Sequence, residues 1–160
     1  MKVKILAFLF SVMICSVSSA AVKIELPEVI GSWHMSGKVL TPLITEYNGE
    51  NQGTVAYFTY SRNTPNGTLE VIVTEGAGTG NIYIPESVGK SKGLMSADAD
   101  FEILEISGHG ALIENQSYLP LVLAINVSNN ITLTLESQSL NKSEIINIAE
   151  MILSEWNVTE

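Results

Sequence analysis

The sequence predicts an α+β domain, in which a twisted antiparallel β-sheet of about seven strands carries a C-terminal amphipathic helix on one face. Three observations predict this class. Apolar and polar residues alternate over several short segments, as is typical of strands with one buried face. Short turn sequences separate these segments, so most neighbours are expected to pair as hairpins. The last periodic segment, residues 141–156, instead repeats its apolar residues at three- and four-residue spacing, as a helix does.

The helix is predicted to begin after Asn141. The side chain of Asn141 can accept a hydrogen bond at the helix N-terminus, and Glu144 three residues later completes a capping box. A stripe of this kind usually packs on a sheet, and the alternative is a docking helix for a partner. The predicted stripe comprises Ile145, Ile148, Ala149, Ile152 and Trp156.

A hairpin is predicted over residues 121–135, directly before the helix. Opposed residues of an antiparallel pair point to the same face, so apolar residues must oppose apolar residues. A three-residue loop over 128–130 meets this condition, and it requires a left-handed conformation at Asn130. The predicted pairs are Val127 with Ile131, Ile125 with Leu133, and Leu123 with Leu135.

A second hairpin is predicted from the alternation over residues 55–75. Its turn leaves two registers open, a two-residue Asn66-Gly67 turn or a longer loop that begins at Pro65. We favour the longer loop, because it sets Arg62 against Glu70 as a pair of opposite charges.

Other segments complete the predicted sheet. Residues 101–115 are expected to form a hairpin with His109 at its tip, and Pro42 predicts an edge strand over residues 38–47. Trp33 is expected to be a core anchor beside the sheet.

The first twenty residues are predicted to be a signal peptide. Lys2 and Lys4 precede an apolar run that ends at Cys15, and Ser18-Ser19-Ala20 fits a cleavage site after Ala20. The run is shorter than the roughly 20 residues that span a membrane. Residues 21–160 are then expected to form a single domain without a membrane span. The expected location is secreted or on the exterior of the cell envelope, which is the periplasm if the source is Gram-negative.

The charge balance excludes some partners. The chain has 8 Lys and Arg against 17 Asp and Glu, and two of the lysines leave with the leader, so the predicted domain has a net charge of −11. Nucleic acid and anionic membrane surfaces are therefore not expected as partners, because phosphate binding needs clustered basic residues. The single cysteine, Cys15, also lies in the leader, so neither a disulfide nor a cysteine ligand is expected.

Asn-x-Ser/Thr sequons are frequent in this chain, which suggests a glycosylated exported protein. The alternative is a chain whose turns are simply rich in Asn, Ser and Thr. A sixth sequon, at Asn141, is set aside because this side chain is expected to cap the helix. The candidate glycosylation sites are Asn66, Asn115, Asn126, Asn130 and Asn157.

Two stretches carry candidate binding residues. Asp98, Asp100 and Glu102 offer alternate carboxylates, which is a weak indication of a cation site because alternate side chains of a strand share a face without converging. Residues 86–99 form the longest segment expected to be irregular, and Lys90 and Lys92 make it a candidate binding loop.

The sequence shows no catalytic set and implies no cofactor. The glycine-rich stretch after Glu75 is followed by a strand-like segment, whereas a phosphate loop requires a helix there. His34 and His109 stand apart without cysteines, so they do not predict a zinc site. No Ser-His-Asp arrangement or nucleophile elbow is legible.

From Asp100 to Trp156 the chain carries the segments FEILEISGHGALIE, LVLAINVSNNITLTLES and SLNKSEIINIAEMILSEW. This order of hairpins and an amphipathic helix resembles the secreted PsbP/Mog1-like α+β domains, of uncharacterised function. The resemblance implies a binding or assembly module, because most members of that class act in this way, and it carries over no functional residue.

Three functions are therefore considered. The first is an exported, non-enzymatic module that binds an unknown partner protein or envelope component. The second is a small-ligand or cation carrier that uses residues 76–102, which a pocket lined by Trp33, Tyr57, Phe58 and Tyr60 would favour. The third is a carboxylate-based hydrolase, which would need buried, paired acids with raised pKa values.

Overall fold

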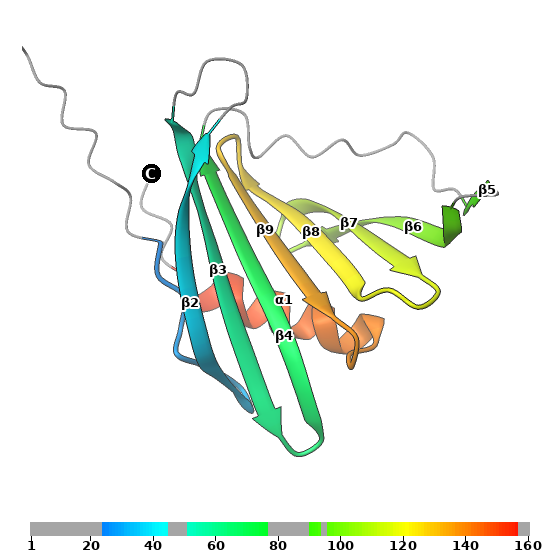
Figure 1. Ribbon diagram of the computed structural model, residues 1–160, viewed down its shortest axis with the longest axis horizontal. Helices are drawn as coiled ribbons and strands as arrows, with labels where there is room; N and C mark the ends of the chain where they lie inside the picture. Colours follow the sequence, from blue (N-terminus) through cyan, green and yellow to red (C-terminus); the bar gives the residue numbers. More distant parts are fainter. Residues whose placement is uncertain (1–23, 45–50, 77–89, 94–95, 157–160) are drawn as a thin grey trace, which may run out of the picture.

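The computed structural model describes residues 24–44, 51–76, 90–93 and 96–156, which form one nine-stranded sheet and one helix (Figure 1). The α+β class and the C-terminal helix are confirmed. Nine strands replace the expected seven, because two short edge strands are too brief to show an alternating pattern. The elements are β1 (Val29–Ile30), β2 (Trp33–Ile44), β3 (Asn51–Asn63), β4 (Asn66–Gly76), β5 (Lys90–Gly93), β6 (Ser96–Ile106), β7 (His109–Gln116), β8 (Leu121–Ser128), β9 (Ile131–Ser137) and α1 (Lys142–Glu155).

The sheet consists of two antiparallel meanders joined at their ends. Its order is β1-β2-β3-β4-β9-β8-β7-β6-β5, so the strands before and after residue 76 form separate halves. The halves meet where β4 pairs with β9, from Glu70 opposite Glu136 to Glu75 opposite Ile131. The centre of the sheet is therefore built from strands that are far apart in the sequence.

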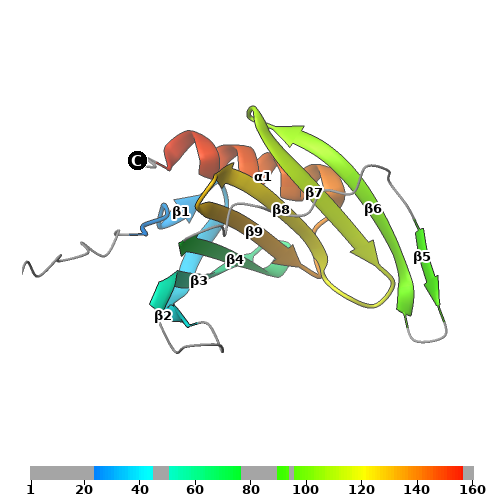
Figure 2. The same ribbon diagram turned by 90° about the horizontal axis from the view of Figure 1, so that it is seen from above.

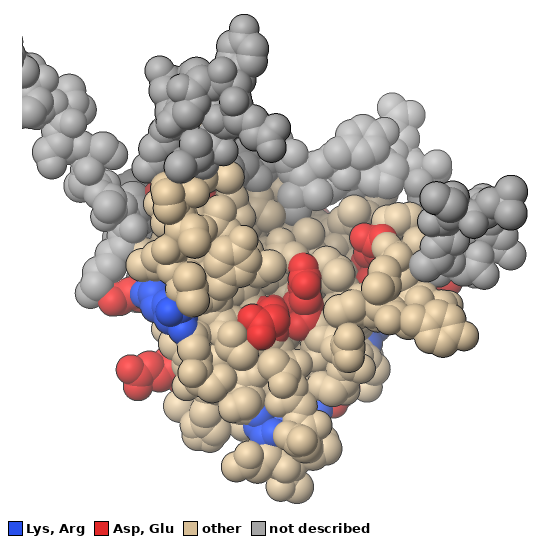
Figure 3. All heavy atoms as spheres, viewed as in Figure 1, with Lys and Arg blue, Asp and Glu red and all other residues tan. Residues whose placement is uncertain are grey.

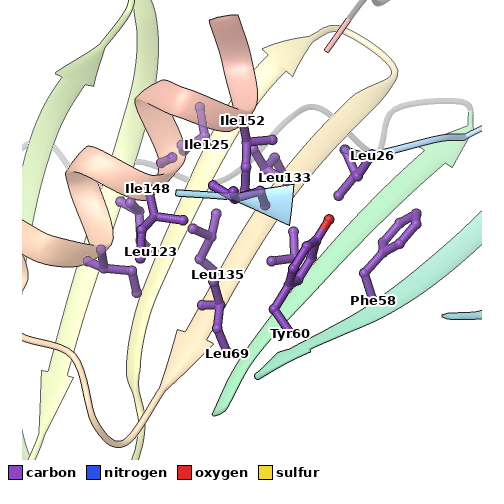
Figure 4. Close-up of a cluster of buried hydrophobic side chains, with 14 of the residues drawn as sticks. Leu26, Phe58, Tyr60, Leu69, Leu123, Ile125, Leu133, Leu135, Ile148 and Ile152 are labelled. Atoms are coloured by element: carbon purple, nitrogen blue, oxygen red, sulfur yellow. The ribbon is translucent and has the colours of Figure 1, made fainter. Parts of the chain in front are cut away.

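Helix α1 covers one face of this sheet, which we call the inner face, and the sheet curves around it (Figure 2). Ile145, Ile148 and Ile152 are at most 4% exposed. Ile148 and Ile152 point toward Leu123 and Leu133 of the sheet (Figure 4). Each such side chain contributes about 1.5–3 kcal/mol when it is fully buried. The predicted packing of the apolar stripe on the hairpin is thus confirmed.

The predicted capping box is also present. The Asn141 Oδ1 accepts a hydrogen bond from the Glu144 N–H at 3.1 Å, and the Glu144 Oε2 accepts one from the Asn141 N–H at 3.0 Å. The two bonds satisfy donors that would otherwise lack a partner at the helix start. In the described part of the chain, no helix has the length and apolar character to cross a membrane.

The β8–β9 hairpin confirms the two predicted pairs farthest from the turn. The third predicted pair is wrong, because Ser128 rather than Val127 opposes Ile131, with a register shift at Val127. Asn130 does not have the predicted left-handed conformation. One bulged residue, Val127, precedes a two-residue turn over residues 129–130, and together they restore the apolar pairing that a three-residue loop would give. The confirmed pairs are Ile125 with Leu133 and Leu123 with Leu135.

Two other turns also differ from the predictions. In the β3–β4 hairpin the turn lies at Thr64-Pro65, so Tyr60 opposes Leu69 and both registers considered from the sequence are wrong. In the β6–β7 hairpin the turn is formed by Ser107 and Gly108, both with positive φ, and His109 is the first residue of β7 rather than the tip. The segment 86–99, expected to be irregular, contains β5 and the start of β6.

Trp33 is the core anchor that the sequence predicts. Its side chain is 2% exposed, and the Arg62 guanidinium lies 4.5 Å from its ring centroid. Arg62 also lies 3.8 Å from a carboxylate oxygen of Glu144. Cation–π contact and ion pair together connect β2, β3 and the start of α1.

Candidate functional site

The face of the sheet opposite α1, which we call the outer face, is covered by none of the described elements (Figure 1). An apolar row crosses it, made of residues that oppose one another from strand to strand. Three of its large side chains are well exposed: Val39 by 58%, Tyr57 by 41% and Ile103 by 37%. The complete row is Val39, Tyr57, Ile72, Thr134, Ala124, Leu112 and Ile103.

An acidic row runs parallel to the apolar row on the same face, at a distance of two residues along each strand. Glu70 of β4 directly opposes Glu136 of β9, and Glu114 of β7 lies two strands beyond Glu136, with Val122 between them. The Thr59 hydroxyl donates a hydrogen bond of 3.0 Å to Glu70 Oε2. Like charges that directly oppose each other across a strand pair are destabilising. The outer face therefore holds an acid pair that a cation would relieve.

Basic side chains do not neutralise this acid pair within the described residues. Lys38 donates to the Ile24 carbonyl at 2.8 Å and lies over the ring of Phe58, Arg62 stacks on Trp33, and Lys142 pairs with Glu102. Figure 3 shows acidic side chains at the middle of the outer face and basic ones only at its margins. The face is thus partly apolar and negatively charged.

The acid pair borders a hollow of about 360 Å³. Its lining is mostly polar and consists of Thr68, Glu70, Pro120, Glu136, Ser137, Gln138 and Ser139. The neighbouring turn exposes Tyr118 completely and Leu119 by 53%. A hollow in which two carboxylates lie among hydroxyl and amide groups is suited to a cationic group, and the apolar row begins two residues away on β4 and β9.

A second hollow, of about 540 Å³, lies at the start of α1 and contains two of the candidate cation ligands. Its buried side chains are Ile113, Leu121 and Leu140, and Asp100 and Glu102 are exposed at its edge. On the inner face of β6, Ile106 is buried, whereas Asp100 and Glu102 nearer the start of the strand are exposed. The reason is that this part of the sheet extends beyond the helix (Figure 2).

The three acids do not form a metal site in the described residues. Asp100 and Glu102 share a face of β6, as alternation predicts, but Lys142 binds Glu102 as an ion pair. For Asp98 the structure describes the backbone, on β6. No group of three His, Cys, Asp or Glu side chains within the described residues is arranged to hold a metal ion.

The other candidate residues are distributed over the molecule. Lys90 and Lys92 belong to edge strand β5, for which the structure describes the backbone. His34 is exposed on β2 and His109 is partly buried on β7. Of the candidate glycosylation sites, Asn66, Asn115 and Asn130 are exposed, Asn126 is partly buried on β8, and Asn157 lies outside the described residues.

The four aromatic residues whose gathering in one pocket would favour the carrier hypothesis lie on opposite faces of the sheet. Trp33, Phe58 and Tyr60 are buried on the inner face, whereas Tyr57 points outward. The Tyr60 hydroxyl donates a 2.7 Å hydrogen bond to the Pro27 carbonyl, and burial raises the pKa of Tyr60.

The hydrolase hypothesis required buried, paired acids with raised pKa values. Partial burial raises the pKa of Glu75 at the end of β4. Its register partners are Thr54 and Ile131, so neither strand sets a second acid against it.

Comparisons of the chain with protein-family models, with curated proteins and with solved structures found no match. The resemblance of residues 100–156 to PsbP/Mog1-like domains therefore stays a prediction.

The apolar and acidic rows were missed by sequence reasoning. The sequence predicts the hairpin that contains Tyr57 and Glu70, but it does not predict the pairing of β4 with β9, which sets Glu70 against Glu136. A usable signal was present, because the polar positions of these strands include Ile72, Leu112 and Ile103, which are more apolar than a solvated face requires.

Proposed function

We propose that this protein is an exported, non-enzymatic binding or assembly module whose outer sheet face contacts a partner protein or an envelope component. The observation that carries the proposal is the apolar row on the uncovered outer face. Exposed apolar surface that is contiguous and rimmed by polar residues is typical of interaction sites. Antiparallel sheets commonly leave one face exposed to solvent, but the side chains on such a face are usually polar.

A photocrosslinking pair tests this proposal in the native host. A photoreactive phenylalanine analogue replaces Tyr57 on the outer face or, as a control, Asn147, which is exposed on α1 at the other side of the sheet. We expect one defined crosslinked product at position 57 and none at position 147. The additional substitution Ile72→Ser should remove the product. Equal labelling at both positions, or none at position 57, would overturn the proposal.

Export has its own test. Mass spectrometry of the protein recovered from outside the cytoplasm should show an N-terminus at Ala21, as expected from the predicted cleavage site. The same spectra report hexose-containing mass additions at Asn66, Asn115 or Asn130. Recovery of the uncleaved chain from the cytoplasm alone would contradict export.

A small-ligand or cation carrier is the second candidate function, and the hollow beside Asp100 and Glu102 favours it. Its volume falls within the range of roughly 300–1,000 Å³ that is usual for ligand pockets. Calcium should then raise the melting temperature of the wild-type chain and have no effect on the Asp100→Asn variant. An equal response of both proteins would exclude this hollow as the cation site.

A further inference from the structure

We infer that the outer face recognises a partner segment that presents an arginine side chain beside apolar residues. This inference rests on the function proposed above and names the chemistry of the partner. It begins with the opposed carboxylates of Glu70 and Glu136, which lie on adjacent strands at the border of a hollow. Adjacent strands are about 4.8 Å apart, so the two carboxylates are close enough to share one cationic group.

Arginine fits this arrangement better than lysine does. The guanidinium is planar and presents several N–H donors in a fixed fork, so it can bond two carboxylates at once. The Thr59 hydroxyl already donates to one oxygen of Glu70 and so holds that carboxylate in place. Binding of a guanidinium would also remove the repulsion between the two acids, which adds to the affinity for a cation.

The apolar row determines what must flank the arginine. Ile72 and Thr134 lie two residues from Glu70 and Glu136 on the same strands, which corresponds to about 7 Å. Tyr57 continues the apolar row on β3 and is 41% exposed. A segment whose arginine enters the hollow therefore places its neighbouring side chains on this row, and these must be apolar.

A second copy of this chain does not have the required chemistry. The chain has a single arginine, Arg62, and its guanidinium lies over the ring of Trp33 and beside Glu144. The whole chain has a net charge of −9, so two copies repel each other at this face. The complementary partner is a different, basic polypeptide.

Defined peptides test the inference directly. The probe is a short fluorescent peptide of arginine, leucine and alanine, and its matched control has glutamine in place of each arginine. Anisotropy titrations with the full chain should show tighter binding of the arginine peptide by at least about tenfold. A lysine version should fall between the two. Equal affinity for the arginine and glutamine peptides would overturn the inference.

Charge variants separate the acid pair from the general negative charge of the protein. The double variant Glu70→Gln/Glu136→Gln should lose the preference for arginine and should unfold at a temperature no lower than wild type. The control Glu150→Gln/Glu155→Gln removes the same charge from exposed positions of α1 and should keep the preference. Equal losses in both double variants would mean that only the net charge matters and would overturn the inference.

Ile72→Ser distinguishes this inference from the proposed function. If Ile72→Ser abolishes crosslinking at Tyr57 in the host while the Glu70/Glu136 variant leaves it intact, the outer face is an interaction surface for a partner without the arginine. If the peptides bind as expected but crosslinking at Tyr57 fails, the proposed function falls.

Discussion

Tyr60 fastens the first described residues to the sheet. Its hydroxyl donates to the Pro27 carbonyl at 2.7 Å, and its ring is fully buried. Replacement by phenylalanine keeps the ring and removes the bond, so Tyr60→Phe should lower the free energy of unfolding by about 1 kcal/mol. Urea denaturation measures this change. Tyr57→Phe, whose ring is partly exposed on the outer face, should leave the midpoint unchanged.

The same hydroxyl predicts a dependence on alkaline pH. Burial raises the pKa of Tyr60 above its ordinary value of about 10, so the folded state holds this proton more tightly than the unfolded state does. The contribution of Tyr60 is therefore complete below pH about 10 and is lost as the pH rises further. Melting temperatures between pH 8 and 11 should fall more steeply for wild type than for Tyr60→Phe. Parallel curves would contradict this reasoning.

Glu75 is predicted to destabilise the protein at neutral pH. Partial burial raises the pKa of its carboxyl group, so the folded state favours the protonated form. Glu75→Gln should raise the melting temperature at pH 7, and the difference should shrink as the pH falls through the range in which free glutamate protonates, about 4. Glu105→Gln, at an exposed position of β6, is the matched control and should cause no comparable rise.

The two edges of the sheet are protected to different degrees. Strand β5 has four residues, two of them lysines, and short charged edges resist pairing with other chains. Strand β2 has twelve residues, and β1 pairs only with Trp33 and His34. Val39 and Leu40 are more than half exposed on the remainder. Pro42 lacks an N–H and so denies a hydrogen bond to an incoming strand.

Removal of Pro42 is therefore predicted to promote self-association. Pro42→Val supplies a backbone donor and a residue that favours strands. The apparent mass of this variant protein should therefore rise with its concentration. Light scattering after gel filtration measures this. Thr41→Val changes strand propensity without adding a donor, and it should behave as wild type. A monomeric Pro42→Val variant at high concentration would show that this edge is protected in another way.

The sequence correctly predicts the elements that depend only on residues near one another in the chain. The capping box at Asn141 and the stripe of α1 are correct because both depend on residues within one or two helical turns. Two of the three predicted β8–β9 pairs are correct, because matching apolar residues across the strands determines them, and the pair next to the turn is wrong because of the bulge at Val127. The predicted β3–β4 turn is wrong because the prediction rests on the Asn66-Gly67 motif and on a surface charge pair. The apolar match between Tyr60 and Leu69 determines the observed register.

The candidate site was less predictable than the elements. The outer-face rows depend on the order of the strands, and no local pattern reports that β4 lies beside β9. Glu70 and Glu136 become neighbours only through this pairing. Alternation correctly predicted that Asp100 and Glu102 share a face, but the ion pair with Lys142 depends on where α1 begins relative to β6.

The whole molecule should unfold in one step, because each half of the sheet is completed by the other. Helix α1 packs across both halves, and Arg62 connects Trp33 of the first half to Glu144 of the helix. In a Trp156→Phe background, fluorescence of Trp33 and the helical circular dichroism signal should give the same denaturation midpoint. Two separate midpoints would show that the halves are independent units.

The pairing of β4 with β9, the last strand of the chain, also determines how early during synthesis the sheet can fold. A polypeptide leaves the ribosome from its N-terminus, so β1 to β4 emerge long before β9 and α1 exist. Long-range pairing of this kind makes folding slow, because closing the long connecting segment costs conformational entropy before β4 and β9 form any contact. Until α1 is synthesised, the apolar side of the early strands has no helix to cover it, so these strands depend on the last element of the fold for burial.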